Sequence, residues 1–102
     1  KQLQENERSA KDAAVLALEQ TWAALQDAMQ NVEVKRLNLT ATEERSNIAQ
    51  AQYSIGLLSF DNWTIIEDNL VNAKSSYLSA QSAALLAEAN WILAKGETIE
   101  YE

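Results

Sequence analysis

The sequence predicts an all-α fold, a long antiparallel two-helix coiled-coil hairpin that self-associates into a bundle. Three observations predict it. The 102 residues contain no proline and only two glycines, Gly56 and Gly96, so few positions favour the end of a helix. Apolar residues recur with heptad spacing in both halves, which is typical of coiled-coil helices. Turn-forming residues gather near the middle, where we expect the chain to reverse its direction.

The first predicted helix covers about residues 3–54. Steps of three and four residues connect a frame of apolar positions at Val15, Leu18, Trp22, Leu25, Met29, Val32 and Leu39. Arg36 interrupts this frame, and Glu43 and Ser46 weaken it further along. Apolar residues return at Ile48, which leaves open a shift of the contact face towards the end of the helix.

The predicted turn covers about residues 55–60. Gly56 can adopt the left-handed backbone conformation that ends a helix. Ser59 can cap the next helix, and the carboxylate of Asp61 favours the positive end of the helix dipole. A connection this short places the two helices side by side and antiparallel.

The second predicted helix covers about residues 61–95. Its seam contains Trp63, Ile66, Leu70, Ala73, Tyr77, Ala80, Ala84, Ala87, Trp91 and Ala94. A second apolar stripe repeats every seven residues at Val71, Leu78, Leu85 and Ile92. One partner helix would leave this stripe half covered, so we expect the chain to self-associate. Lys95 and Gly96 predict the end of this helix, with residues 96–102 frayed.

Folding the chain about residue 58 pairs positions on the two predicted helices. This register places Trp22 near Trp91 or Ala94, Met29 near Ala87 and Leu39 near Tyr77. We predict that the large side chains pack in the seam, at Trp22, Met29, Leu39, Trp63, Leu70, Tyr77 and Trp91. Tyr53 and Trp63 flank the turn, and we expect them to pack on one another or on the neighbouring helix rather than hold a ligand.

Composition argues against catalysis. The chain has no cysteine and no histidine, which removes the thiolate and imidazole groups of many catalytic and metal sites. Neighbouring carboxylates, such as Glu43 and Glu44, point about 100° apart on a helix and cannot form a general acid and base pair. We therefore predict no catalytic residues, no metal, no cofactor and no enzymatic activity.

Charge and hydropathy argue against two classes of partner. The net charge is −7 and the basic residues are scattered, whereas nucleic-acid binding requires clustered Lys and Arg. No run approaches the roughly 20 apolar residues that span a bilayer, so we expect no membrane contact by this segment. The chain begins at Lys1 rather than methionine, and we expect it to be a piece of a longer protein.

The predicted turn also carries a family resemblance. Tyr53, Gly56 and Ser59 resemble the Tyr-x-x-Gly-x-x-Ser/Thr tip of the TolC-type outer-membrane efflux proteins. Further segments fall at the spacing of this family, namely Asn72-Ala73-Lys74, Tyr77-Leu78 and Leu93-Ala94-Lys95-Gly96. The resemblance extends from Ala49 to Gly96, and it is looser upstream.

The resemblance implies the periplasmic hairpin of a homotrimeric outer-membrane channel. Such channels work with a periplasmic adaptor (membrane fusion) protein and an inner-membrane pump, in tripartite efflux or type I secretion. By resemblance the adaptor docks on the tip, at Gly56, Leu57, Leu58, Ser59, Phe60 and Asp61. The sequence holds one hairpin and no β-barrel strands, so we expect it to form only part of the channel.

Two questions stay open at this point. Family members often carry acidic residues at positions occupied here by Asn62 and Ile65, so an acidic gate formed instead by Asp61, Glu67 and Asp68 is unresolved. The main alternative function is a structural coiled-coil oligomerisation module unrelated to transport. A membrane-surface helix is a weaker alternative, because such helices favour basic polar faces.

Overall fold

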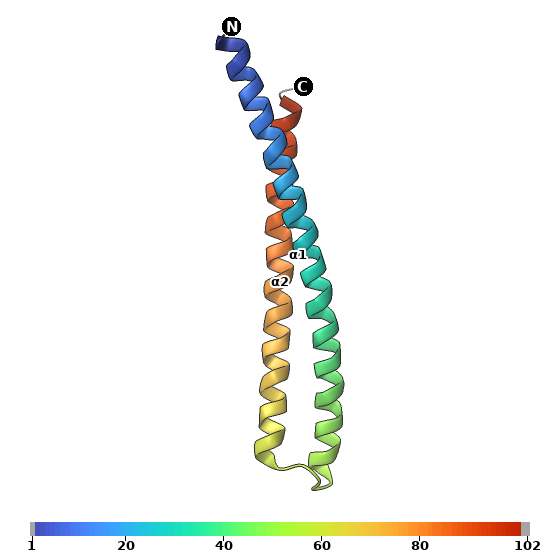
Figure 1. Cartoon of the computed structure of the whole chain (residues 1–102). Helices are drawn as coiled ribbons and strands as arrows, with labels where there is room; N and C mark the ends of the chain where they lie inside the picture. Colours follow the sequence, from blue (N-terminus) through green and yellow to red (C-terminus); the bar gives the residue numbers. More distant parts are fainter. Residues whose placement is uncertain (1, 101–102) are drawn as a thin grey trace. The chain divides into compact units, whose positions relative to one another are not determined.

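The structure, a computed structural model, describes residues 2–100, with side chains for residues 5–97 and 99 (Figure 1). Helix α1 spans Gln2–Ser54 and helix α2 spans Phe60–Glu100, with 53 and 41 residues. Residues 55–59 connect the helices, and no strand occurs within residues 2–100. The predicted all-α antiparallel hairpin is confirmed. The bounds of α1 agree closely with the predicted 3–54.

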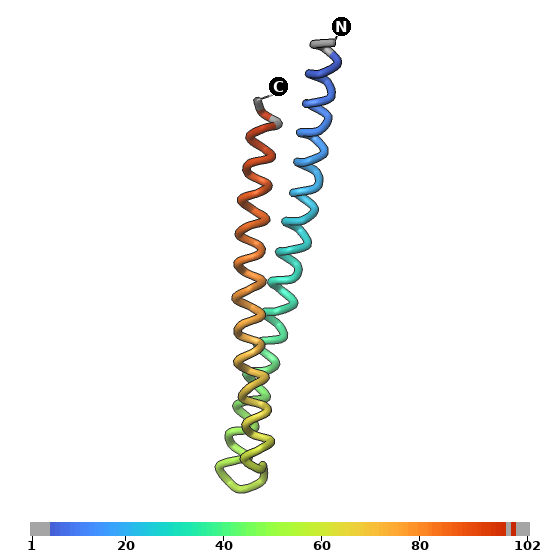
Figure 2. Tube along the Cα trace, turned by 90° about the vertical axis from the view of Figure 1, so that its left-hand side faces the viewer, coloured from blue at the N-terminus to red at the C-terminus, as the bar shows by residue number. Residues whose placement is uncertain are grey.

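The chain divides into two compact units, each containing a segment of both helices. The turn unit consists of Gln30–Gln81, and the terminal unit consists of Lys1–Met29 with Ser82–Glu102. Within each unit the α1 and α2 segments run side by side in opposite directions (Figures 1 and 2).

The seam of α2 is the one that the sequence predicts. Every predicted position from Trp63 to Ala94 is buried or half-buried. Its large aromatic residues recur at every second heptad, at Trp63, Tyr77 and Trp91, and three alanines separate Tyr77 from Trp91. The three aromatic side chains are half-buried.

The seam of α1 differs from the prediction at every second position. Buried or half-buried residues occur at Ala14, Leu18, Thr21, Leu25, Ala28, Val32, Lys35, Leu39, Thr42, Ser46 and Ala49. The predicted residues Val15, Trp22 and Met29 are exposed, Trp22 by 47% and Met29 by 54%. The prediction chose the larger member of each neighbouring pair. The seam takes the smaller one, and the larger neighbour lies exposed beside it.

The contact face of α1 does not shift towards its end. Ser46 and Ala49 are buried and continue the same heptad pattern, whereas Ile48 is exposed. Ser46 was interpreted as a weakness of the seam, and this interpretation is wrong.

The predicted end of α2 at Gly96 is also wrong. Helix α2 continues through Gly96 to Glu100, and Gly96 does not have a positive φ. Residues 96–100, predicted to be frayed, are helical, and residues 101–102 lie outside the described range. A glycine lowers helix propensity by about 1 kcal/mol, which a long helix can tolerate at one position.

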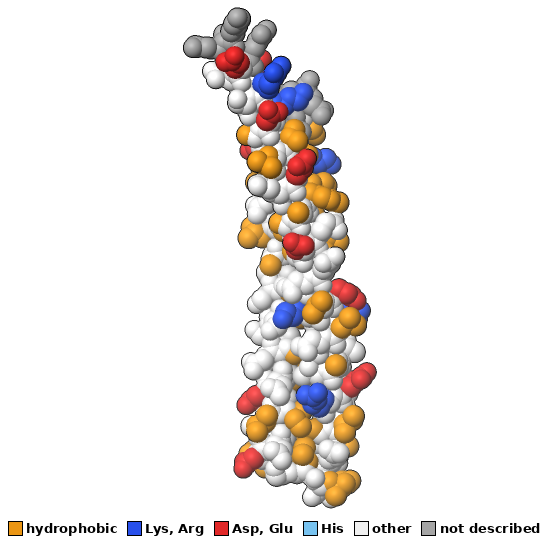
Figure 3. Space-filling model, viewed as in Figure 1, with side chains coloured by type: hydrophobic (Ala, Val, Ile, Leu, Met, Phe, Trp, Pro, Cys, Tyr) orange, Lys and Arg blue, Asp and Glu red, His pale blue; other side chains and the backbone are white. Residues whose placement is uncertain are grey.

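The buried core of the described residues is small. It consists of Ala14, Leu25, Ser46, Ala49, Ala73, Ala80 and Ala94. No large side chain in the described range is fully buried, and many apolar side chains reach the surface in both units (Figure 3, orange). The hairpin therefore leaves extensive apolar surface in contact with solvent.

Candidate partner-binding tip

The tip, residues 55–59, begins with a Schellman helix stop. Gly56 has a φ of +78°, in the left-handed region. Its N–H donates a hydrogen bond to the carbonyl of Tyr53 at 3.1 Å, and the N–H of Leu57 donates to the carbonyl of Gln52 at 2.8 Å. These two bonds satisfy carbonyl groups at the end of α1. The predicted role of Gly56 is confirmed.

The other side of the tip is fixed by the start of α2. The backbone N–H of Asn62 donates to Oγ of Ser59 at 3.2 Å, and the N–H of Trp63 donates to the carbonyl of Ser59 at 3.0 Å. Ser59 is therefore the N-cap, as predicted. Asp61 lies in the first turn of α2, where its charge is favourable. The connection is held at both ends.

Three aromatic rings pack around the tip. The rings of Tyr53 and Trp63 stack with centroids 5.3 Å apart and an interplanar angle of 20°. Phe60 lies 6.2 Å from Tyr53 and 5.9 Å from Trp63, in tilted arrangements. The predicted packing of Tyr53 on Trp63 is confirmed, and Phe60 completes a cluster that connects the two helices. Contacts of this kind stabilise by about 0.5–1.5 kcal/mol each.

The tip and the first residue of α2 expose apolar side chains. Leu57 is 73% exposed, Ile55 70% and Phe60 60%, while Leu58 is half-buried. Gly56, Ser59 and Asp61 are also exposed. The sequence analysis left Ile55 out of the docking residues. Its place directly before the helix-ending glycine, at the first position after α1, is the signal that its side chain is exposed.

A cross-helix hydrogen bond lies further along the turn unit. Oγ of Ser46 donates to Oε1 of Glu67 at 2.6 Å, and Glu67 is half-buried. Glu67 is therefore engaged within the hairpin, while Asp61 and Asp68 are exposed. Within the part of the chain whose side chains are described, no three acidic residues are placed to hold a metal ion.

The only described ion pair occupies the position where the predicted apolar frame is interrupted. Arg36 donates hydrogen bonds to both carboxylate oxygens of Glu33, with 3.0 Å from Nε to Oε2. This hydrogen bonding lowers the pKa of Glu33 and raises that of Arg36. Both side chains are exposed, so water weakens the interaction.

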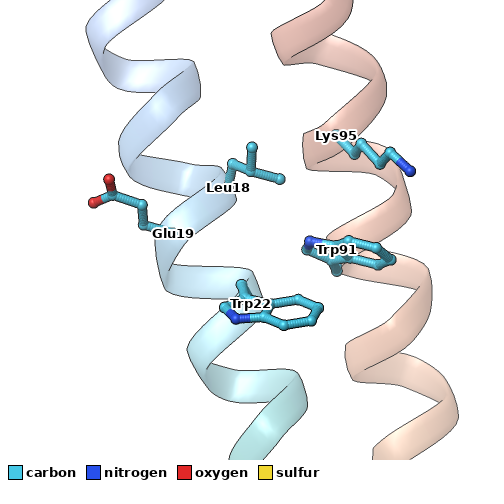
Figure 4. A pocket seen from close by; sticks show the side chains of 5 residues that line it. All are labelled: Leu18, Glu19, Trp22, Trp91 and Lys95. Atoms are coloured by element: carbon cyan, nitrogen blue, oxygen red, sulfur yellow. The ribbon is translucent and has the colours of Figure 1, made fainter.

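The terminal unit contains an apolar groove of about 410 Å³ (Figure 4). Leu18, Glu19, Trp22, Trp91 and Lys95 line it. The rings of Trp22 and Trp91 lie 5.2 Å apart, and Nζ of Lys95 lies 5.1 Å from the centre of the Trp91 ring. The predicted contact between the two tryptophans is confirmed, although Trp22 lies beside the seam rather than in it.

A second groove, in the turn unit, is polar and has a volume of about 280 Å³. It is lined by Asn38, Thr42, Arg45, Asn69, Asn72, Ala73 and Ser76. The hydroxyl of Thr42 already donates to the carbonyl of Asn38 at 2.7 Å. The exposed apolar tip and this groove thus differ in the chemistry that they offer to a partner.

Comparisons with known proteins add no relative to this picture. Neither described helix contains a stretch that is both long and apolar enough to cross a membrane. The chain matches no family model, no curated protein and no solved structure.

Proposed function

We propose that the chain is the periplasmic coiled-coil hairpin of a TolC-like outer-membrane channel, with a tip that docks a periplasmic adaptor protein. The channel serves tripartite efflux or type I secretion. One observation carries the proposal: a fixed turn exposes Ile55, Leu57 and Phe60 at the end of a helical pair. The residues of the family resemblance also form this turn, because Gly56 ends α1 and Ser59 begins α2.

The tip geometry supports docking on energetic grounds. A turn held by a Schellman stop and an N-cap loses little conformational entropy when it binds. One tip offers only a small contact, which gives weak binding by itself. The tips of a homotrimer engage together, so the adaptor binds with useful affinity. In this arrangement an inner-membrane pump supplies the substrate, and the hairpin catalyses no reaction.

The test introduces Leu57→Asp into the full-length protein that carries this hairpin. Leu57 is exposed, so the change costs little folding stability, but a charge within an apolar contact opposes docking. We expect loss of export and loss of chemical cross-linking to the adaptor. Circular dichroism and outer-membrane insertion should be unchanged.

The matched control is Leu37→Asp in the same turn unit. Leu37 is 55% exposed on α1 and receives the same change of charge away from the tip. We expect this variant to keep export and adaptor cross-linking. Normal export and cross-linking in the Leu57→Asp variant would overturn the tip assignment, as would equal loss in both variants.

The second candidate function is a structural oligomerisation module. The observation that favours it is the exposed heptad stripe of α2, at Val71, Leu78, Leu85 and Ile92. If the chain is an oligomerisation module, the Leu57→Asp variant assembles as the wild type does, and only changes on the stripe abolish assembly. The two functions therefore predict opposite outcomes for the tip variant.

A further inference from the structure

One face of α2 in the terminal unit is regular but uncovered. It consists of residues spaced alternately by three and four, at Ser82, Leu85, Ala89, Ile92, Gly96 and Ile99. We name it the α2 docking face. All six residues are exposed, and large apolar side chains alternate with small ones. Its spacing equals that of the seam, so the surface that fits it is another coiled-coil helix.

Gly96 indicates how closely that helix approaches. Glycine is unfavourable within a helix, yet α2 passes through Gly96 with no stop. A side chain added at Gly96 would meet no atom within 4 Å, so nothing in the hairpin requires a glycine there. Close approach of another backbone is the circumstance that favours glycine on a helix face.

We propose that the occupant is a second copy of this chain, which places its own α2 docking face antiparallel against the first. One register sets each large residue opposite a small one. In it, Leu85 faces Gly96 of the second copy, Ile92 faces Ala89 and Ile99 faces Ser82. A two-fold axis repeats every contact, as in isologous dimers. The surface is thus complementary to itself.

Charges beside the face select the same register. It places Glu88 opposite Lys95 of the second copy on one flank, and exposed Leu86 opposite Leu93 on the other. If the second copy slides by one heptad, Glu88 lies opposite Glu88 of the second copy in one direction, and Lys95 lies opposite Lys95 of the second copy in the other. Both shifts bring like charges together. Neither residue has an ion-pair partner in the described part of the hairpin. The cation of Lys95 lies over Trp91, from where its flexible side chain can reach across the flank.

This dimer rests on a different surface from the proposed channel role, although it shares Leu85 and Ile92 with the stripe of the second candidate function. It uses the terminal unit, whereas adaptor docking uses the tip in the turn unit. The two proposals fail separately, because the dimer is measured as oligomeric state and adaptor docking is measured as export.

The first experiment is sedimentation equilibrium of the 102-residue chain over a series of concentrations. We expect a monomer–dimer equilibrium for the wild type and a monomer for Ile92→Asp. The matched control Leu16→Asp changes a residue of similar exposure on α1 of the same unit and should dimerise normally. A wild-type chain that is monomeric throughout overturns the proposal, as does equal association of Ile92→Asp.

A second variant separates loss of pairing from loss of folding. Gly96→Leu raises helix propensity, and its added Cβ meets no atom within 4 Å in the hairpin, so the monomer should be at least as helical by circular dichroism. It should nevertheless fail to dimerise, because the added side chain prevents the close approach of Leu85. Dimerisation with wild-type affinity contradicts the proposed contact.

A charge exchange tests the register. Lys95→Glu alone should raise the dimer dissociation constant roughly tenfold, because two exposed ion pairs are replaced by two like-charge contacts. Glu88→Lys alone should act similarly, and the double variant Glu88→Lys with Lys95→Glu should regain most of the wild-type affinity. If the double variant is as weak as the single variants, the two-fold register is wrong.

Discussion

Gly56 and Gly96 are the two glycines of the chain, and they act through opposite physical effects. Gly56 has a positive φ that other residues adopt at a cost, whereas Gly96 lies within α2. An added Cβ meets no atom at either position, so conformation alone decides the effect of a substitution. We expect Gly56→Ala to destabilise the fold by about 1 kcal/mol and Gly96→Ala to stabilise it by up to about 1 kcal/mol.

The two alanine variants are compared by urea denaturation in the Ile92→Asp background, so that dimerisation does not enter the measurement. We expect the free energy of unfolding to fall in the Gly56→Ala variant and to rise in the Gly96→Ala variant. A stabilising Gly56→Ala variant would contradict the assigned Schellman stop.

The ion pair between Glu33 and Arg36 makes a small contribution to the stability of the hairpin, and this contribution depends on pH. Hydrogen bonding to Arg36 lowers the pKa of Glu33 below its ordinary value of 4.5. Because the folded-state pKa is the lower one, the contribution to stability is complete above the ordinary value and is lost as pH falls through the folded-state pKa. We expect an NMR titration of the Glu33 carboxyl group to show a midpoint that rises in the Arg36→Ala variant. Equal midpoints would show that the ion pair does not persist in solution.

Residues at the tip differ in how far the sequence determines their roles. Gly56 and Ser59 were predictable because a helix stop and a helix cap depend on local backbone chemistry. The partner of Tyr53 was predictable from the proximity of Trp63. Phe60 joining these rings depends on side-chain directions in three dimensions, which periodicity does not specify.

At the scale of the element, α2 was predictable in its seam and α1 only in part. The seam of α2 is an unbroken series of ten apolar positions, and the sequence indicates it even though Val71, Leu78, Leu85 and Ile92 lie directly beside seam positions. Along α1, Val15, Trp22 and Met29 form a regular apolar series one residue after the true seam positions. Hydrophobicity favours this series, but the seam takes the smaller neighbours Ala14, Thr21 and Ala28. The choice depends on volume across the interface, which one helix does not reveal.

The tryptophan pair tests this difference between the two helices. Trp91 lies in the seam and is half-buried, whereas Trp22 lies beside the seam and is 47% exposed. We expect Trp91→Ala to cost about 3 kcal/mol and Trp22→Ala about half as much, measured by denaturation in the Ile92→Asp background. A larger cost at Trp22 would support the seam predicted from sequence over the one observed.

For the whole molecule, the small core makes stability depend on association. The described core holds mostly alanine, and no large side chain is fully buried, so the hairpin alone gains limited hydrophobic stabilisation. Binding of a second copy to the folded state adds stability by mass action. We expect the melting temperature of the wild-type chain to rise with protein concentration. The Ile92→Asp variant should melt at a temperature that does not change with concentration, and a parallel rise in that variant would exclude the α2 docking face as the cause.

The tip, which is fixed by a Schellman stop at one end and an N-cap at the other, also bears on the order in which the chain folds. Closing a loop costs entropy that grows with its length, and the tip closes the shortest loop between α1 and α2. Tyr53, Phe60 and Trp63 are close in sequence, so we expect their contacts to form before contacts between positions further from the turn. A change that weakens the cap at Ser59 should then slow folding more than it accelerates unfolding. The same turn that exposes Leu57 in the folded protein is then the nucleus from which we expect helix pairing to start.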